Sequence, residues 1–223
     1  MSELSAKKLL IDPLSDNNPI TVQVLGVCSA LAVSGSIKNA LVMAVAVTLV
    51  TAFSNLTVSS LRNYIPSRIR MIVQLVVIAF LVTLVSLFLQ AFSYDLSKEL
   101  SVYVGLIITN CILMGRLEAF ALANKPWPSF LDGIGNGLGY GLILVIVGFI
   151  RELFGTGGLF LGTPLGFTFF GNEANHSIEF LKGDFFHAFF HNGLMVLPIS
   201  SIFILGILIW IQRSRNAELV DIS

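Results

Sequence analysis

Charged residues are scarce in this sequence. They make up 12% of its 223 residues, whereas a soluble domain carries roughly a quarter. The 13 basic and 13 acidic residues cancel, so the chain has no basic excess that would attract nucleic acid. Hydrophobic residues account for 55% of the chain and form long blocks such as residues 71–92. The composition therefore excludes a soluble enzyme and a nucleic-acid-binding protein, and it predicts an integral membrane protein in a lipid bilayer.

A recognisable signal peptide is also missing. The first 20 residues contain lysines but no apolar run that ends at a cleavage site. We therefore expect the first membrane segment to remain in the chain after insertion.

Six apolar segments are visible in the sequence. Four approach or reach the length of about 20 residues that crosses a bilayer, at residues 40–61, 69–92, 134–153 and 194–211. The other two, at residues 20–33 and 100–114, are shorter. At about 1.5 Å per residue, each covers only some 20 Å of a hydrocarbon core about 30 Å thick. We expect these two segments to be half-helices or broken helices.

The order of these segments indicates two inverted halves. Each short segment precedes two long ones, and an odd number of crossings gives the halves opposite orientations. Short segments at matching places in inverted halves point to a functional site near mid-membrane. The predicted fold class is an all-α membrane protein with about six transmembrane segments in two inverted three-helix repeats, of which the first and fourth segments are short or broken. The repeats cover about 19–92 and about 100–212, within one transmembrane domain of residues 19–212.

Positive charges predict the orientation of this domain. One side holds the N-terminal segment 1–18, the loops around residues 62–70 and 116–125, and the tail 213–223. That side collects most of the basic residues, and the other side keeps Lys38, Lys98, Arg151 and Lys182. Cytoplasmic loops carry an excess of Lys and Arg, so both termini are predicted to be cytoplasmic. Some loops would change side if the short segments did not cross.

The loop of residues 155–192 is longer than a connection needs to be. It carries His176 and several acidic residues. We expect this loop to contact another subunit.

Cysteine is rare, and its placement is informative. The chain has only Cys28 and Cys111, one in each short segment. A lone membrane cysteine is usually a small apolar filler, but a pair confined to the two unusual segments favours a ligand role. Thiolates bind copper, zinc and iron–sulfur clusters, and a zinc or [2Fe–2S] site takes four protein ligands, so a partner would supply the rest. Helix ends would offer backbone N–H groups to an anionic cluster, and Gly26, Gly105 and Gly115 would allow close approach.

Two other interpretations of the cysteines stay open. His187 and His191 lie four residues apart on one helical face and would complete a Rieske-like set. The phenylalanines around these histidines are more typical of an interfacial amphipathic helix. Alternatively, Cys28 and Cys111 would form a disulfide bond with each other.

Asp132 precedes a run in which five glycines alternate with other residues. Carboxylate and backbone oxygens suit hard cations, and buried acids in membranes often mark ion paths, so Asp132 is a candidate residue of a cation path. The alternative is a helix N-cap followed by glycines that allow close helix packing. Arg116 with Glu118, and Arg151 with Glu152, lie at span ends and are expected to snorkel to the interface or to pair with one another.

Four motifs resemble one known family. LGVCSALAV, RNYIPSRIR, LSVYVGLIITNCILMGRLEAFA and FLDGIGNGLGYG are similar to the D-type subunit of the bacterial sodium-translocating NADH:quinone oxidoreductase (Nqr). The resemblance covers residues of about 17–155 and resumes at 192–203. The E-type subunit of the Rnf complex (a ferredoxin:NAD oxidoreductase) shares the TNC-x-x-x-GR-x-EAFA core. In Rnf relatives, Pro typically follows the first cysteine and the glycine run is less regular, so the sequence favours Nqr.

The resemblance implies a subunit of the bacterial inner membrane that pairs with a homologous E-type subunit of inverted topology. In that family, cysteines of the two subunits hold one [2Fe–2S] cluster inside the membrane. The matching positions here are Cys28 and Cys111, beside the backbone of Gly26, Asn110 and Gly115. The resemblance further implies that the cluster relays electrons across the membrane, coupled to Na⁺ export, and that NAD, FAD, FMN and the quinone are bound by the A-, B-, C- and F-type subunits.

The chain is therefore expected to act as a subunit of an NADH:quinone reductase and not to be catalytic alone. It has no G-x-G-x-x-G unit of a dinucleotide-binding fold. Ser86 stands where relatives often carry an acid, which weakens an ion-conducting role for that position. The alternatives are an E-type subunit of an Rnf complex, a cofactor-free ion-conducting or transporter subunit, and a structural anchor for redox subunits.

Overall fold

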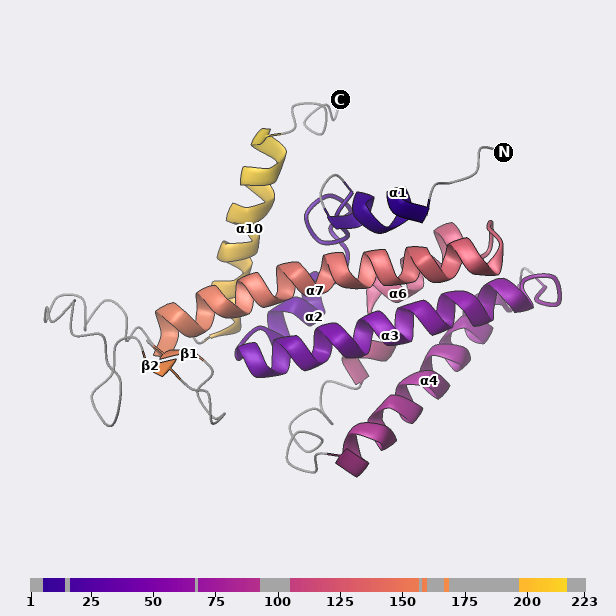
Figure 1. The fold of residues 1–223 in the computed structure, drawn as a ribbon, viewed down its shortest axis with the longest axis horizontal. Coiled ribbons are helices and arrows are strands. Elements are labelled where there is room, and N and C mark those ends of the chain that lie inside the picture. The colour runs from indigo at the N-terminus through magenta and orange to yellow at the C-terminus, as the bar shows by residue number, and fades with distance from the viewer. Residues whose placement is uncertain are drawn as a thin grey trace, which may run out of the picture. The chain divides into compact units, whose positions relative to one another are not determined.

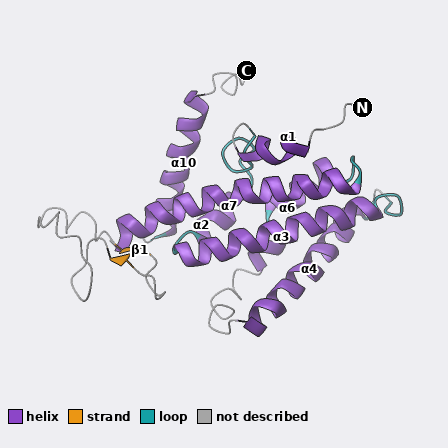
Figure 2. Ribbon diagram, in the orientation of Figure 1, coloured by secondary structure: helices purple, strands orange, loops and turns teal. Residues whose placement is uncertain are grey.

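The computed structural model describes residues 6–14, 17–66, 68–92, 105–156, 158–159, 167–168 and 197–215. Helices dominate these residues, and the strands among them are two short ones (Figure 2). The chain divides into two compact units, one of Met1–Ser29 with Met43–Leu142 and one of Ala30–Val42 with Ile143–Ser223.

Three of the described helices are long and apolar enough to cross a membrane (Figure 1). They are α3 (Ile37–Leu61), α4 (Arg70–Phe92) and α7 (Pro126–Thr156). The 31 residues of α7 extend over roughly 46 Å, which exceeds the hydrocarbon core. A further apolar helix, α10 (Pro198–Arg215), is shorter. The six-segment inverted repeat stays a prediction.

The predicted boundaries are accurate for α3 and α4 but wrong for the start of α7. Helix α7 begins at Pro126, not at residue 134. Pro126 and Pro128 lie in its first turn, where a backbone N–H has no intrahelical acceptor and the fixed φ of proline suits a helix. The predicted start of the last segment, residue 194, lies outside the described residues, and the described helix begins at Pro198.

The first short segment contains only a seven-residue helix, α2 (Val27–Val33). Turns precede it at residues 19–23, followed by two residues with positive φ, Val24 at 54° and Gly26 at 76°. Positive φ is rare for a β-branched residue and readily adopted by glycine. The chain therefore turns sharply just before Cys28.

The second short segment is broken. Residues 105–108 are helical, the helix is interrupted at Thr109 and Asn110, and α6 (Cys111–Arg116) begins at the cysteine. Asn110 caps α6, because its side chain accepts a hydrogen bond from the Ile112 backbone N–H. A π-helical turn, η2 (Leu117–Ala121), follows directly.

The glycines of α7 create two packing faces within the first unit. A Cβ added at Gly133 would lie 2.8 Å from the Ala52 Cα, and one added at Gly137 would lie 2.6 Å from the Thr48 Cα. Helix α3 therefore packs directly on the α7 backbone (Figure 1). The expectation that these glycines allow close helix packing is thus confirmed.

The second glycine face of α7 contacts the N-terminal segment, which comprises α1 (Ala6–Ile11) and η1 (Asp12–Leu14). A Cβ at Gly135 would lie 2.6 Å from the Leu9 carbonyl oxygen, and one at Gly139 would lie 2.5 Å from that of Pro13. Asn18 Nδ2 also donates to the Gly139 carbonyl at 3.1 Å. Leu9, Pro13 and Asn18 therefore lie along α7.

In the second unit, two charged side chains near the end of α7 form hydrogen bonds with backbone groups at the ends of other helices. Glu152 Oε2 accepts a hydrogen bond of 2.7 Å from the Ile37 N–H, the first of α3. Arg151 donates to Ser34 Oγ at 2.7 Å and to the Leu31 carbonyl near the end of α2. Both charged residues are buried. A carboxylate at a helix N-terminus and a cation at a helix C-terminus complement the unpaired backbone groups there.

A small antiparallel ladder departs from the all-α prediction. Strands β1 (Gly158–Leu159) and β2 (Phe167–Thr168) pair Gly158 with Thr168 and Leu159 with Phe167. The rest of the predicted 155–192 loop, including His176, His187 and His191, lies outside the described residues after Thr156.

Candidate functional site

The two cysteines lie at equivalent places, each at the beginning of a short helix. Cys28 is the second residue of α2 and Cys111 is the first residue of α6. Both are free thiols and both are exposed, whereas Ser29 and Asn110 next to them are buried. The disulfide interpretation is therefore wrong, and both sulfur atoms lie at the surface of the chain.

Hydrogen bonds join the two cysteine-bearing segments. Asn110 Nδ2 donates to Ser29 Oγ at 3.2 Å, and Ser29 Oγ lies 2.9 Å from the hydroxyl of Tyr140 on α7. All three side chains belong to the first unit. The residues beside Cys28 and Cys111 are thus held against each other and against the interior of α7.

Glycine contacts reinforce this junction. A Cβ added at Gly26 would lie 2.6 Å from the Ile112 side chain, and one at Gly115 would lie 3.1 Å from Leu25. Both glycines therefore pack closely against side chains of this chain. At Gly105 an added Cβ would have no neighbour within 4 Å, so no described residue approaches closely there.

Within the described residues, no group of three or more His, Cys, Asp and Glu gathers into a site for a metal ion. Cys28 and Cys111 are two free thiols among these residues. His187 and His191, proposed for a Rieske-like set, lie outside the residues that the structure describes.

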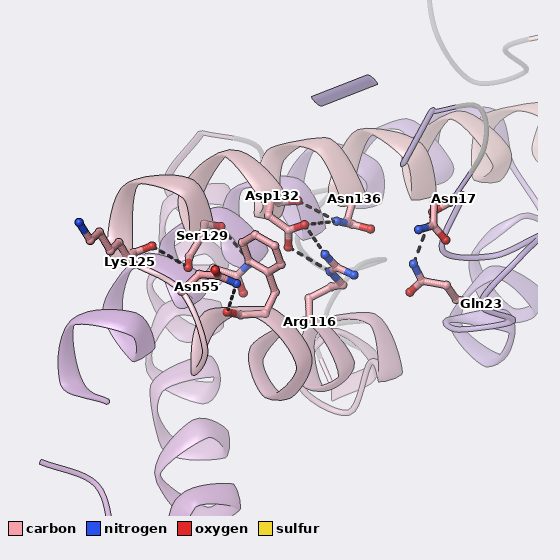
Figure 3. Close-up of polar contacts among 10 residues, drawn as sticks. Asn17, Gln23, Asn55, Arg116, Lys125, Ser129, Asp132 and Asn136 are labelled. Carbon is pink, nitrogen blue, oxygen red and sulfur yellow. Dashed lines mark hydrogen bonds and ion pairs between the residues drawn. The ribbon is translucent and has the colours of Figure 1, made fainter. Parts of the chain in front are cut away.

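A second polar cluster surrounds Asp132, at the other end of α6 (Figure 3). Arg116, the last residue of α6, forms a two-point ion pair with Asp132, in which Nε donates to Oδ2 at 3.0 Å and Nη2 contacts Oδ1. Asn136, one turn further along α7, donates to Asp132 Oδ1 at 3.0 Å. Asp132 is 1% exposed, so its charge is compensated inside the protein.

The N-cap interpretation of Asp132 is wrong. Helix α7 begins at Pro126, which places Asp132 in the second turn and not at a helix end. Its carboxylate therefore binds side chains and not the free N–H groups of a first turn. The side-chain oxygen of Asn136 is buried and has no hydrogen-bond partner among the described residues.

Glu118 has a different set of partners from Arg116, although the two residues are close in sequence. Glu118 lies in η2, forms an ion pair with Arg70 and accepts a hydrogen bond of 3.0 Å from Gln74 of α4. The Arg116 guanidinium also lies 5.4 Å from the centre of the Phe120 ring, within range of a cation–π contact. These contacts attach η2 to α4 and α6 to α7.

Sequence reasoning missed Ser29, Tyr140, Asn136 and Gln74. A weak signal was present for the last two, because amide side chains inside apolar helices usually have partners. Ser29 and Tyr140 gave none, because small hydroxyl residues and tyrosines are common in membrane helices.

Comparison with known proteins gives relatives along almost the whole chain. Residues 6–209 match the family described as Rnf-Nqr subunit, membrane protein. The chain is 54% identical over 215 residues to the D subunit of the Na(+)-translocating NADH-quinone reductase of Shewanella sp. (strain ANA-3), an alignment that covers 96% of this chain and 95% of that protein. The same values hold for the D subunits of Shewanella baltica (strain OS155) and of Shewanella sp. (strain W3-18-1). The chain therefore belongs to the Rnf-Nqr family of membrane subunits.

Proposed function

We propose that the chain is the D-type subunit of a sodium-translocating NADH:quinone reductase, in which Cys28 and Cys111 are two of the four ligands of a [2Fe–2S] cluster. Relatives named as this subunit are similar to the chain over 96% of its length. The observation that best supports the ligand role is the hydrogen bond from Asn110 to Ser29, because it joins the residues next to the two exposed thiols.

The chemistry of the two thiols fits half of such a cluster. A [2Fe–2S] cluster is commonly held by four cysteine thiolates. This chain offers two free cysteines, both exposed, on segments that are bonded to each other. Exposed ligands suit a shared cluster, because a second chain can approach them from outside.

The proposed partner at the cluster is the homologous E-type subunit, with the opposite orientation and two more cysteines. The bound cluster would supply one-electron transfer. This chain would hold two of its ligands and orient them toward the partner. NADH oxidation, the flavins FAD and FMN, and the quinone would belong to the A-, B-, C- and F-type subunits.

Asp132 is the proposed residue of a cation path. Its carboxylate is buried and bound by Arg116, and the free side-chain oxygen of Asn136 lies on the same helix one turn away. Carboxylate and amide oxygens are ligands for hard cations. A Na⁺ ion at Asp132 would therefore have to displace or share the guanidinium, which makes Arg116 a competitor of the ion.

The proposed topology has both termini in the bacterial cytoplasm. Residues 1–18 and 213–223 would then flank a transmembrane domain of residues 19–212. A reporter fused within residues 172–182 is expected to be periplasmic, and a cytoplasmic readout would contradict the orientation.

Iron analysis with electron paramagnetic resonance (EPR) tests the ligand role in the assembled complex. We expect Cys28→Ser and Cys111→Ser each to abolish one [2Fe–2S] signal with a matching loss of iron and sulfide. Thr109→Ser is the matched control, because Thr109 is exposed and only two residues from Cys111. Wild-type iron in both cysteine variants would overturn the proposal. A complex without this iron that still transports Na⁺ would favour a cofactor-free ion-conducting subunit.

A further inference from the structure

Three buried polar side chains are linked by hydrogen bonds next to the two exposed cysteines. Ser29 follows Cys28, Asn110 precedes Cys111, and Tyr140 extends from the middle of α7. Their exposed fractions are 3%, 3% and 0%, although both cysteines are exposed. In an apolar interior such groups are costly unless they are paired, so their hydrogen bonds determine how these segments pack.

The hydrogen bonds of this trio saturate the serine hydroxyl. Ser29 Oγ donates to the Gly26 carbonyl at 2.9 Å and accepts from Asn110 Nδ2 at 3.2 Å. A hydroxyl has one proton to donate, so the 2.9 Å contact with Tyr140 is a bond in which Tyr140 is the donor. Asn110 Oδ1 in turn accepts from the Ile112 N–H at 3.2 Å. Ser29 therefore links three separate segments through a single oxygen atom.

We propose that Tyr140, Ser29 and Asn110 are positioning residues that set the separation of the Cys28 and Cys111 sulfur atoms. The inference deepens the proposed function, since it rests on these sulfur atoms as cluster ligands. Consecutive Cα atoms are about 3.8 Å apart, and each cysteine is one residue from the Ser29–Asn110 bond. A change in that bond is therefore transmitted to both sulfur atoms over a very short length of chain.

The packing around Ser29, Asn110 and Tyr140 leaves little room for the chain to shift and restore a lost hydrogen bond. Gly26 approaches the Ile112 side chain so closely that no Cβ fits between them. Buried hydrogen bonds in a low dielectric are strong, and the partners of a deleted group are left unsatisfied. The trio is also uncharged, so it fixes the geometry without adding a permanent charge beside the cluster. Its role is thus distinct from that of the thiolates themselves.

Cross-linking in the full chain tests this inference without a cluster. The full-length protein, expressed alone in membranes, is treated with a short rigid bis-maleimide, and Cys28–Cys111 bridging is followed by mass spectrometry. We expect Ser29→Ala to slow bridging by roughly tenfold, because it removes the oxygen atom that both Asn110 and Tyr140 bond. Alkylation of each cysteine by a monofunctional maleimide should keep its wild-type rate. Ser54→Ala is the matched control, because Ser54 is buried and bonds only its own helix at Thr51.

Tyr140→Phe provides a milder variant that keeps the ring and its packing. In the assembled complex we expect unchanged iron content but shifted or broadened [2Fe–2S] g-values, since the geometry of the ligands is less uniform. The Ser29→Ala/Tyr140→Phe double variant should bridge no more slowly than Ser29→Ala alone, because Tyr140 acts through Ser29.

The outcomes separate the two proposals. Wild-type bridging rates in Ser29→Ala and Tyr140→Phe would overturn the positioning role, even if both cysteines prove to bind iron. Slower bridging in these variants supports the positioning role, even if Cys111→Ser leaves the iron of the complex unchanged. Independent, additive effects of the two substitutions would also overturn it, because they would show that the three side chains do not act as one network.

Discussion

Helix α6 is attached to α7 at both of its ends, and the two attachments differ in charge. At its start, Asn110 reaches Tyr140 through Ser29, by neutral hydrogen bonds. At its end, Arg116 binds Asp132 by a buried ion pair. The neutral attachment lies beside the cysteines and the charged one lies five residues beyond Cys111. The comparison teaches that the polar bonds next to the proposed electron carrier are uncharged, whereas the charged attachment of α6 lies at the proposed cation path.

The charged attachment should be the more sensitive to substitution. We expect Arg116→Gln to lower the free energy of unfolding by about 3–5 kcal/mol, because it leaves the buried Asp132 carboxylate without its cation. Arg116→Met combined with Asp132→Leu should recover most of that loss. Unfolding of the purified protein in mixed micelles with increasing SDS measures both effects. A single variant as stable as the double one would show that the pair is not electrostatically coupled.

The surface of α7 that faces α3 lies between the two attachments. A substitution there should cause the second-largest loss of stability. Gly137→Ala places a Cβ 2.6 Å from the Thr48 Cα, so α3 has to move, at a cost of about 1–3 kcal/mol. Gly206→Ala in α10 is the control, since an added Cβ there meets no described atom within 4 Å. The same SDS titration compares the two variants, and equal stabilities would contradict the close packing of α3 and α7.

The neutral attachment should tolerate substitution better. Tyr140→Phe removes one hydroxyl and is expected to cost about 1 kcal/mol, because Ser29 keeps its bonds to Gly26 and Asn110. A loss as large as that of Arg116→Gln in the same titration would erase the proposed difference between the attachments.

The smallest effect is expected for the exposed ion pair that attaches η2 to α4. Glu118→Gln should change stability by less than about 1 kcal/mol, because the side chains of Arg70 and Glu118 are 40% and 36% exposed. Raising the salt concentration should narrow any difference from the wild type further. A loss above that limit would mean that the neighbouring bond from Gln74 depends on the charge.

Much of the helical layout was predictable, since it follows from apolar length alone. Hydropathy placed α3 and α4 to within three residues at each end. It misplaced the start of α7, because Trp127, two prolines and the glycine run lower the apolar average where the helix already exists. The breaks before Cys28 and Cys111 were predictable as short segments. Their exact positions depend on the turn at Gly26 and the cap at Asn110, which are local backbone features.

The candidate site was predictable only in part. The cysteines could be selected because they are the only two in the chain and lie in matching segments. The ion pair of Arg116 with Asp132 was not, since it depends on how η2 turns the chain between them. Ser29 and Tyr140 are 111 residues apart, and no local sequence pattern predicts a contact across that separation.

The attachment of the N-terminal segment to α7 has a consequence for biosynthesis. Asn18 bonds the carbonyl of Gly139, which is synthesised 121 residues later. Ser29 likewise bonds Tyr140, which is synthesised 111 residues later. During translation these residues are therefore synthesised before the helix that they bind. Ser29 can bond Tyr140 only after α7 has been synthesised, so the junction beside the two cysteines is completed late in the life of the nascent chain.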